Sequence, residues 1–425
     1  MKHKSSVVIV FAIMLIILCS YFFPQLKQSS SENRTMATFK MVLHPEKDSL
    51  VYHESPVERL EAALSDQFPF RETVVKQYLK FFNTSENLTY SVVRPFLGKG
   101  EDQYVLHAIG SYEEIEDTGY ITLFPDTAPL EPAIVEKRVE QIEKIHTEYP
   151  DVKIYTYYVT QAYDMPWFDD YIGMKVADHY KEISDAIPDY VNGGKLVYED
   201  LDDYMNIHYK TDHHMNHRGA DRCYRDIYGM MSRDMELGPM RKILSENDMS
   251  REYGIAYRGS YGQALGKLYD GYDDFSFYTY DLPGRETAVI DPSTMKEIPV
   301  ERIGLYDDYL KGEFSKNPDA DHYILMYGTA VGKDGKTYDD NAFPYVIRNS
   351  RGNGKNLLIT GDSYDRVIRD PLASHFDTTV YLDYRLLSSV PIDTIIETYD
   401  IDVVLISSHT RMWNSEEYLF TFGED

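Results

Sequence analysis

A short apolar stretch that ends in a serine is the part of the chain best suited to chemistry. Leu357 to Ile359 is a continuous apolar run, and Gly361, Asp362 and Ser363 follow shortly after it. Short apolar runs bounded by glycine are typical of buried strands. The spacing from there to residue 376 is helical, so Ser363 would lie on a sharp strand-to-helix turn near main-chain N–H groups. Ser363 is therefore a candidate nucleophile, and an ordinary helix N-cap is the alternative.

A serine hydroxyl needs a base, because it is almost wholly protonated at neutral pH. The candidate lies upstream, where Asp212 precedes His214 in an extended segment just before a predicted helix. This spacing places both side chains on one side of the chain, so the carboxylate could hold the imidazole tautomer and stabilise the imidazolium. His375 and His409 are rival bases, but neither follows an aspartate at the Asp-x-x-His spacing.

The same segment could instead bind a metal ion. Four of its side chains are of types that ligate zinc: Asp212, His213, His214 and His217. However, the spacing is not that of a His-Glu-x-x-His motif, and no cysteine pair completes a site. We therefore expect no metal and no cofactor, while a purely structural role for the segment stays open.

Together these residues resemble the signature of the DHHW family. The similar blocks are 211–214 with 218–220, 357–364 with 371–377 and 381–385, and an amino-terminal block at 66–71. They extend from about residue 60 to 405. DHHW proteins are SGNH-hydrolase-like and are related to the enzymes that O-acetylate alginate and other bacterial exopolysaccharides.

The resemblance implies a role for three residues. By position, Ser363 is the nucleophile, His214 the general base and Asp212 its orienting carboxylate. One departure is Met215, which stands where the family has tryptophan. It puts a packing or sugar-stacking contact in doubt, but it does not affect proton transfer.

The oxyanion site is less well defined, because the sequence has no clear counterpart of the Gly and Asn blocks of SGNH hydrolases. Candidate contacts are the N–H groups of Ser363 and Tyr364, and a loop at Tyr327 and Gly328 that precedes the serine strand. Arg385 also matches a family position near the site, although a salt bridge with Asp383 is an equal alternative.

Helical and strand-like stretches alternate along most of the chain. We expect helices at 131–149, 171–187, 218–235 and 391–399, and strands at 152–159, 195–198, 378–382 and 402–406. Such alternation predicts an α/β fold, here an SGNH-hydrolase-like (flavodoxin-like), mostly parallel sheet flanked by helices, with catalytic residues at the carboxyl edge. The looser stretch 237–317 predicts an inserted β-rich cap, either a lid with an acceptor-binding piece at 258–261 or a decorative subdomain.

The amino terminus predicts a membrane anchor. Residues 1–5 form a basic cytoplasmic tail, and the apolar run 6–23 is near the lower limit for a membrane span. The sequence after it lacks the small residues of a cleavage site, and Leu18 makes Cys19 a poor lipid-attachment site. We expect a single-pass protein of the bacterial cell membrane, with a linker at 24–56 and an extracytoplasmic domain at 57–425.

Charge and cysteine content narrow the choice of partners. The net charge of −27 argues against nucleic acid or an anionic membrane surface as the main partner, and favours a neutral or cationic glycan. With only Cys19 and Cys223, no intrachain disulfide is expected.

The family resemblance favours O-acetyl transfer to a cell-surface or secreted polysaccharide through an acyl-serine. It implies that a membrane-bound O-acyltransferase supplies the acyl group. A carbohydrate O-acetyl esterase with the same triad is one alternative, and a non-catalytic glycan-binding scaffold is the other.

Overall fold

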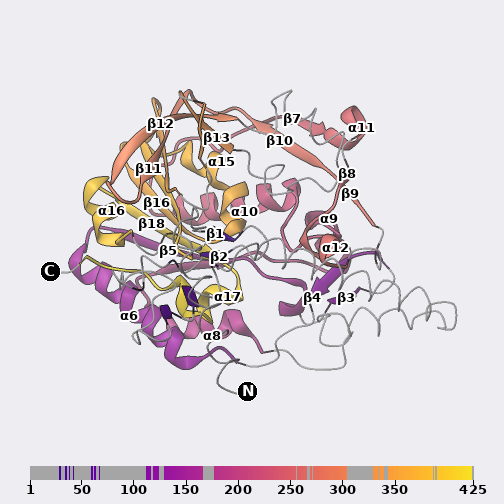
Figure 1. Cartoon of the computed structure of the whole chain (residues 1–425), viewed down its shortest axis with the longest axis horizontal. Coiled ribbons are helices and arrows are strands. Elements are labelled where there is room, and N and C mark those ends of the chain that lie inside the picture. The colour runs from indigo at the N-terminus through magenta and orange to yellow at the C-terminus, as the bar shows by residue number, and fades with distance from the viewer. Residues whose placement is uncertain are drawn as a thin grey trace, which may run out of the picture. The chain divides into compact units, whose positions relative to one another are not determined.

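The computed structural model (Figure 1) divides the chain into two compact units, residues 1–92 and 93–425. The described residues are 28–29, 34–35, 38, 42, 59–60, 62–63, 67, 112–115, 118–123, 129–165, 177–254, 256–265, 269, 271–303, 329–333, 335–338, 343–385, 387 and 390–423. In the first unit, β1 (Gln28–Ser29) and β2 (Arg34–Thr35) pair antiparallel. The second unit contains every described residue for which we predict chemistry.

The predicted tail and anchor, residues 1–23, lie outside the described residues, as does the block 66–71 apart from Gln67. No helix within the described ranges is long and apolar enough to cross a membrane. The anchor, the linker and the domain boundaries therefore stay predictions.

A ten-stranded sheet forms the centre of the second unit. In spatial order its strands are β14 (Thr337–Tyr338), β13 (Thr329–Gly332), β12 (Lys296–Ile303), β11 (Arg285–Asp291), β15 (Tyr345–Asn349), β17 (Thr378–Asp383), β16 (Asn356–Gly361), β18 (Val403–Ser408), β5 (Lys153–Tyr158) and β6 (Asn192–Lys195). The strands from β17 to β6 are parallel, whereas every pairing from β14 to β17 is antiparallel.

The predicted α/β sheet with flanking helices is thus confirmed, but the sheet is mixed rather than mostly parallel. The reason lies in connection lengths. The turn 292–295 between β11 and β12 is short, and so tight a connection permits only antiparallel pairing. Ser293 and Met295 close this turn through N–H bonds to the side chain and the carbonyl of Asp291.

The stretch predicted to form an inserted cap is divided between two places. β11 and β12 extend the main sheet, whereas four other strands form two small antiparallel sheets outside it (Figure 1). These pair β7 (Ile243–Asp248) with β10 (Ser276–Tyr280), and β8 (Ala256–Tyr257) with β9 (Asp273–Asp274). A third small sheet pairs β3 (Tyr112–Glu114) with β4 (Ile121–Leu123).

Helices cover both faces of the sheet. The α-helices are α6 (Pro132–Glu148), α8 (His179–Ala186), α9 (Leu201–Ile207), α10 (His217–Met231), α11 (Met249–Tyr253), α12 (Ser260–Leu265), α15 (Arg369–Ala373), α16 (Ile392–Thr398) and α17 (Thr410–Trp413). The 3-10 helices are η2 (Ala162–Asp164), η4 (Ser363–Val367) and η5 (Glu416–Tyr418).

The continuous apolar run of β16 is explained by burial on both faces. Leu357 and Ile359 pack into the hydrophobic cluster that includes Ile227 of α10. Leu358 packs into the opposite cluster, with Ile142 of α6. Strands buried on both faces read as uninterrupted apolar sequence rather than alternation. Each such side chain contributes roughly 1.5–3 kcal/mol through burial, so the strand that leads to Ser363 is firmly held.

The helix predicted after Ser363 is broken into two short ones, η4 and α15. Pro371 explains the break, because a proline ring clashes with the carbonyl four residues earlier, which belongs to Val367 at the end of η4. Helical structure resumes at Arg369, two residues after the end of η4. The serine therefore lies at the start of a tight 3-10 turn rather than of a long α-helix.

Gly361 should be intolerant of substitution. A Cβ atom there would overlap the carbonyl oxygen of Ser407 and Oδ2 of Asp365. We expect Gly361→Ala to lower the free energy of unfolding by more than about 3 kcal/mol. The matched control is Gly229→Ala in α10, where an added Cβ meets nothing within 4 Å; it should raise stability by up to about 1 kcal/mol. Urea unfolding of both variants tests this, and equal stabilities would contradict it.

Candidate active site

The turn after β16 brings Ser363 to the carboxyl edge of the parallel half of the sheet. Gly361 pairs in register with Asp383 of β17 and with Ser407 of β18, so three strands end together at this edge. Asp362 caps η4, and its Oδ1 accepts the N–H of Tyr364 at 3.0 Å. The strand and this side-chain cap together fix where the Ser363 backbone lies.

The histidine-rich segment forms a turn closed by an isolated antiparallel bridge between His208 and Met215. Asn216 then caps α10 by accepting the N–H groups of Arg218 and Gly219. A Cβ on Gly219 would overlap the carbonyl of Ile207. The glycine that follows the arginine in this block therefore lets α10 start close against the turn.

Asp212, His214 and Ser363 form one hydrogen-bonded chain. His214 Nε2 lies 2.7 Å from Ser363 Oγ, and His214 Nδ1 lies 2.5 Å from Asp212 Oδ1. The side chains of Asp212 and His214 are fully buried. Residues 149 positions apart in sequence are thus brought into contact by the fold. This geometry allows His214 to receive the serine proton while Asp212 holds the ring.

The Asp212 carboxylate is itself held by a glycine-containing loop. Ser260 N–H donates to Oδ2 at 2.7 Å, and the N–H of His214 donates to Oδ1 at 2.9 Å. A Cβ atom at Gly259 would overlap Asp212. Residues 258–261, for which we predicted acceptor binding, therefore include an orienting support for the aspartate, and sequence reasoning missed that support.

A second buried carboxylate, Asp273 at the start of β9, anchors the same segment. Its oxygens accept the N–H of Lys210 at 2.6 Å, and the N–H and hydroxyl of Thr211 at 3.0 and 2.6 Å. Burial raises the pKa of Asp273 to about 6, although these hydrogen bonds lower it. Thr211, the residue just before Asp212, is therefore held by a carboxyl group whose pKa is about 6.

The Asp273 pKa predicts a pH-dependent stability. Because the folded-state pKa exceeds the unfolded value, the proton stabilises the fold fully below pH about 4, and this contribution is lost as pH rises through about 6. Relative to Asp273→Asn, which cannot titrate, the unfolding free energy of the wild type should fall by about 3 kcal/mol over that window. Urea unfolding of both proteins at several pH values measures this, and a pH-independent difference would contradict it.

His213 lies beside the base rather than in the hydrogen-bonded chain. Its Nδ1 lies 2.9 Å from Ser260 Oγ, and its ring centroid lies 3.9 Å from that of His214. Burial, followed by the neighbouring His214, lowers the pKa of His213 to about 3. The residue is therefore neutral at physiological pH and does not compete for the serine proton.

The polar atoms of this segment are committed to hydrogen bonds rather than arranged around an ion. In the described part of the chain, Asp212, His213 and His214 form the one group whose ligand atoms lie within 4.8 Å of one another. However, both ring nitrogens of His214 have protein partners, and His213 Nδ1 faces Ser260. His217 instead bonds to Glu246 at 3.0 Å. These contacts favour a proton relay over a metal centre.

Two of the weaker site predictions are placed by the structure. The N–H of Tyr364 is already donated to Asp362, which argues against the predicted role as an oxyanion donor. Arg385 forms the alternative ion pair, with Nη2 at 2.7 Å and Nε at 3.1 Å from the Asp383 carboxylate. Tyr327 and Gly328 lie outside the described residues.

The remaining candidates also find places. His375 is buried, with Nε2 at 2.9 Å from the Tyr224 hydroxyl and Nδ1 at 2.7 Å from a carbonyl oxygen, which makes it structural. Met215 is 1% exposed and its sulfur lies 3.2 Å from that of Cys223. The methionine at the family's tryptophan position is therefore a packing contact. His409 follows β18 and faces Asp362.

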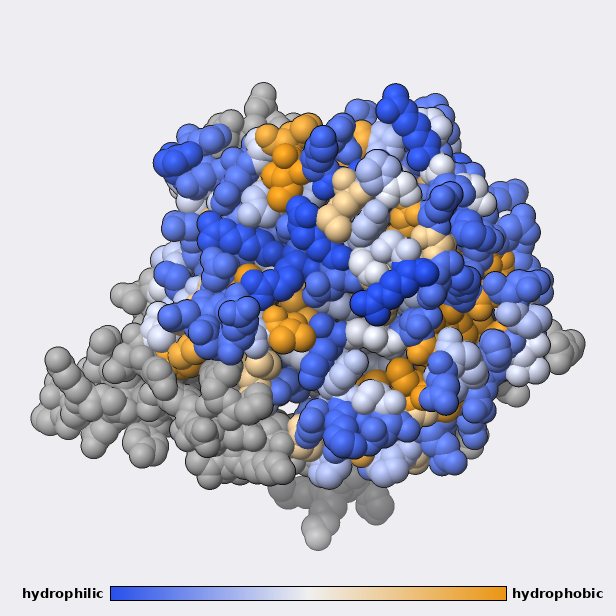
Figure 2. Space-filling view, turned by 180° about the vertical axis from the view of Figure 1, so that it is seen from behind, coloured by the Kyte–Doolittle hydropathy of each residue, from blue (hydrophilic) through white to orange (hydrophobic). Residues whose placement is uncertain are grey.

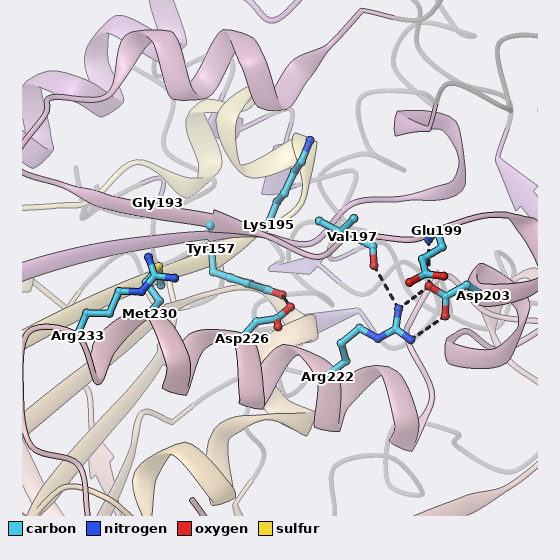
Figure 3. A pocket seen from close by; sticks show the side chains of 11 residues that line it. Tyr157, Gly193, Lys195, Val197, Glu199, Asp203, Arg222, Asp226, Met230 and Arg233 are labelled. Carbon is cyan, nitrogen blue, oxygen red and sulfur yellow. Dashed lines mark hydrogen bonds and ion pairs between the residues drawn. The ribbon is translucent and has the colours of Figure 1, made fainter.

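A separate cavity of about 560 Å³ lies between β6 and α10 (Figure 3). Asp212, His214 and Ser363 do not line it. Two of its charged side chains form an ion pair, because Arg222 donates to both oxygens of Asp203 at 2.7 Å. Figure 2 views the structure from the side opposite to that of Figure 1, and most of the described surface on that side is hydrophilic.

Solved structures share this fold at low sequence identity. PatB1 from Bacillus cereus is 17% identical, and the match covers 73% of this chain and 99% of that one with a TM-score of 0.50. Its structure with a sulfonyl adduct gives a TM-score of 0.51 at 17% identity, over 74% and 99%. A DHHW family protein from Eubacterium siraeum is 15% identical over 73% and 98%, with a TM-score of 0.49.

The likeness to PatB1 is one of fold. A DHHW family protein is among the solved structures that the chain resembles. No protein-family model and no curated protein matches the chain.

Proposed function

We propose that this chain is a serine-dependent O-acyltransferase that moves an acetyl group to a hydroxyl of a cell-surface or secreted polysaccharide. The observation that carries the proposal is the Ser363 hydroxyl at 2.7 Å from His214 Nε2, with Asp212 at 2.5 Å from the other ring nitrogen. Nucleophile, base and orienting carboxylate in this order support acyl transfer.

The first half of the reaction acylates the serine. His214 removes the proton from Ser363 Oγ as the oxygen attacks the carbonyl carbon of an acetyl ester or thioester. The tetrahedral intermediate then collapses, the bond to the donor oxygen or sulfur breaks, and His214 returns the proton to that leaving group. Positioned proton transfer of this kind contributes roughly 10²–10⁴-fold to the rate.

The second half releases the acyl group to a hydroxyl. His214 takes the proton of the acceptor hydroxyl while its oxygen attacks the acetyl-serine, and Ser363 leaves with that proton. Within the described residues, Ser363 N–H has no acceptor, so it is a suitable donor for the oxyanion in both halves. Each such donor is worth about 3–4 kcal/mol.

Several observations support the polysaccharide as acceptor. The sequence resemblance points to exopolysaccharide O-acetylation, and a net charge of −27 suits a neutral or cationic glycan. The predicted anchor at 6–23 would keep the enzyme beside a membrane-bound O-acyltransferase that supplies the acyl group. The polysaccharide acceptor and the membrane-bound acyl donor therefore rest on the sequence alone.

A carbohydrate O-acetyl esterase is the second candidate, because the same three residues would serve it with water in place of the acceptor. A non-catalytic scaffold is disfavoured, since it would not need a serine hydroxyl aligned with a buried Asp–His pair.

The test is to give the full-length chain 4-nitrophenyl acetate with and without a neutral oligosaccharide, and to measure acetylated oligosaccharide and free acetate. The proposal expects acetylated oligosaccharide to form at the expense of acetate, and neither product above background from Ser363→Ala. Acetate alone would identify an esterase. Because PatB1 has been solved with a sulfonyl adduct, a sulfonyl fluoride is a second probe, and it should label only protein that retains Ser363.

A further inference from the structure

A second aspartate–histidine pair lies directly beside the nucleophile, and the mechanism above does not use it. Asp362, the residue before Ser363, places Oδ2 at 2.7 Å from Nδ1 of His409. The N–H of His409 reaches the same oxygen at 3.3 Å. His409 follows β18, which pairs with β16, so neighbouring strands carry the two partners to the same edge.

The Asp362 carboxylate is buried and charged. Burial alone would raise the pKa of Asp362, but His409, followed by Arg385, lowers it to about 2. An anionic carboxylate at Oδ2 requires a proton on the facing nitrogen, so Nδ1 of His409 is a donor. The other nitrogen, Nε2, then lies on the side of the ring away from this hydrogen bond, which holds the ring in one orientation.

The Nε2 atom of His409 has no hydrogen-bond partner among the described residues, and the side chain is 18% exposed. The ring centroid of His409 lies 5.1 Å from that of Tyr364, and the Tyr364 centroid lies 4.8 Å from that of His214. His214 and His409 therefore both lie beside the Tyr364 ring, and each is hydrogen-bonded to its own aspartate.

We propose that His409 is a positioning residue for the acyl acceptor, and that Nε2 of His409 forms a hydrogen bond with a hydroxyl group next to the one that reacts. This inference rests on the proposed function. It defines the acceptor as a polyol, such as a sugar ring with neighbouring hydroxyls, rather than a simple alcohol. His214 still performs the proton transfer, because only its Nε2 is hydrogen-bonded to Ser363.

This assignment predicts that the two halves of the reaction separate. Acylation of Ser363 by a small donor needs no neighbouring hydroxyl, and neither does transfer to methanol or water. Transfer to an oligosaccharide needs one, and loss of a hydrogen bond of this kind should cost about tenfold in rate.

The test compares wild type, His409→Ala, His409→Gln and the control His146→Ala, which replaces a histidine on α6. For each full-length protein, acetyl-serine formation from 4-nitrophenyl acetate is followed by intact mass, and the acetyl group is then partitioned among water, methanol and cellotetraose. We expect His409→Ala to acylate within about threefold of wild type and to lose about tenfold in transfer to cellotetraose only. His409→Gln, which keeps a polar group of similar reach, should regain part of that loss.

Two results would overturn the inference. One is transfer to cellotetraose by His409→Ala at the wild-type rate, and the other is a loss of acylation equal to that of Ser363→Ala. Failure of the proposed function is distinct from both, because the wild type itself would then give no acetyl-serine or no acetylated oligosaccharide.

Discussion

His214→Ala should slow the acylation of Ser363 by about 10⁴-fold or more, while the melting temperature changes by only a few degrees. The Nε2 atom of His214 is the only base within hydrogen-bond distance of Ser363 Oγ among the described residues. Without it the hydroxyl stays protonated and is a weak nucleophile. Stopped-flow release of 4-nitrophenol, together with thermal melting, measures both quantities.

The matched control is His213→Ala, which removes the neighbouring histidine. Its ring contacts His214 and its Nδ1 faces Ser260, but it does not reach Ser363. We expect a loss of less than about tenfold, caused by looser packing around His214. A severe effect at residue 213 with a mild one at residue 214 would reverse the assignment of the base.

Asp212→Asn should lower the acylation rate of Ser363 by about 10³–10⁴-fold, while the fold of the protein stays the same. Asp212 accepts the ring proton of His214 on Oδ1 and the N–H of Ser260 on Oδ2. An amide cannot accept on both sides, because one of its ends is a donor. The variant therefore either repels Ser260 or holds the imidazole in the wrong tautomer.

The control for this variant is Asp226→Asn, in which the changed carboxylate accepts the Tyr157 hydroxyl at 2.9 Å and lines the separate cavity of Figure 3. Its activity should stay within about threefold of wild type. If both substitutions were equally harmless, the Asp212–His214 contact would have no part in proton transfer.

Local patterns were sufficient to find the main elements around the site. The apolar run before Gly361 is a strand because both of its faces are buried, and the Asp-x-His spacing puts its two side chains together within one short turn. Both features arise from residues close in sequence. The contact between His214 and Ser363 depends instead on the fold, and the family resemblance suggested it.

Other features could not be found in the same way, because they depend on contacts between distant residues. Gly259 and Ser260 reach Asp212 from positions 47 and 48 residues away, and nothing in their local sequence marks that partner. The pairing of His409 with Asp362 is equally distant. His409 comes just after a core strand that ends at the same edge as the serine strand. This position would indicate the pairing with Asp362, but only once the strand order is known.

The mixed sheet is a further example. The segments 285–291 and 296–303 have strand-like composition, but composition does not specify which sheet a strand joins. Their short connection decides that they pair antiparallel, and β15 then links them to the parallel half. Composition thus predicted β-rich structure in 237–317, but it did not indicate that two of the strands would extend the main sheet.

The most direct test of the account is the intact mass of the full-length chain after brief exposure to 4-nitrophenyl acetate, beside Ser363→Ala and His214→Ala. We predict one acetyl adduct on the wild type, mapped by peptide analysis to Ser363, and no adduct above background on either variant. Equal labelling of all three proteins, or an adduct on another residue, would contradict the acyl-serine mechanism.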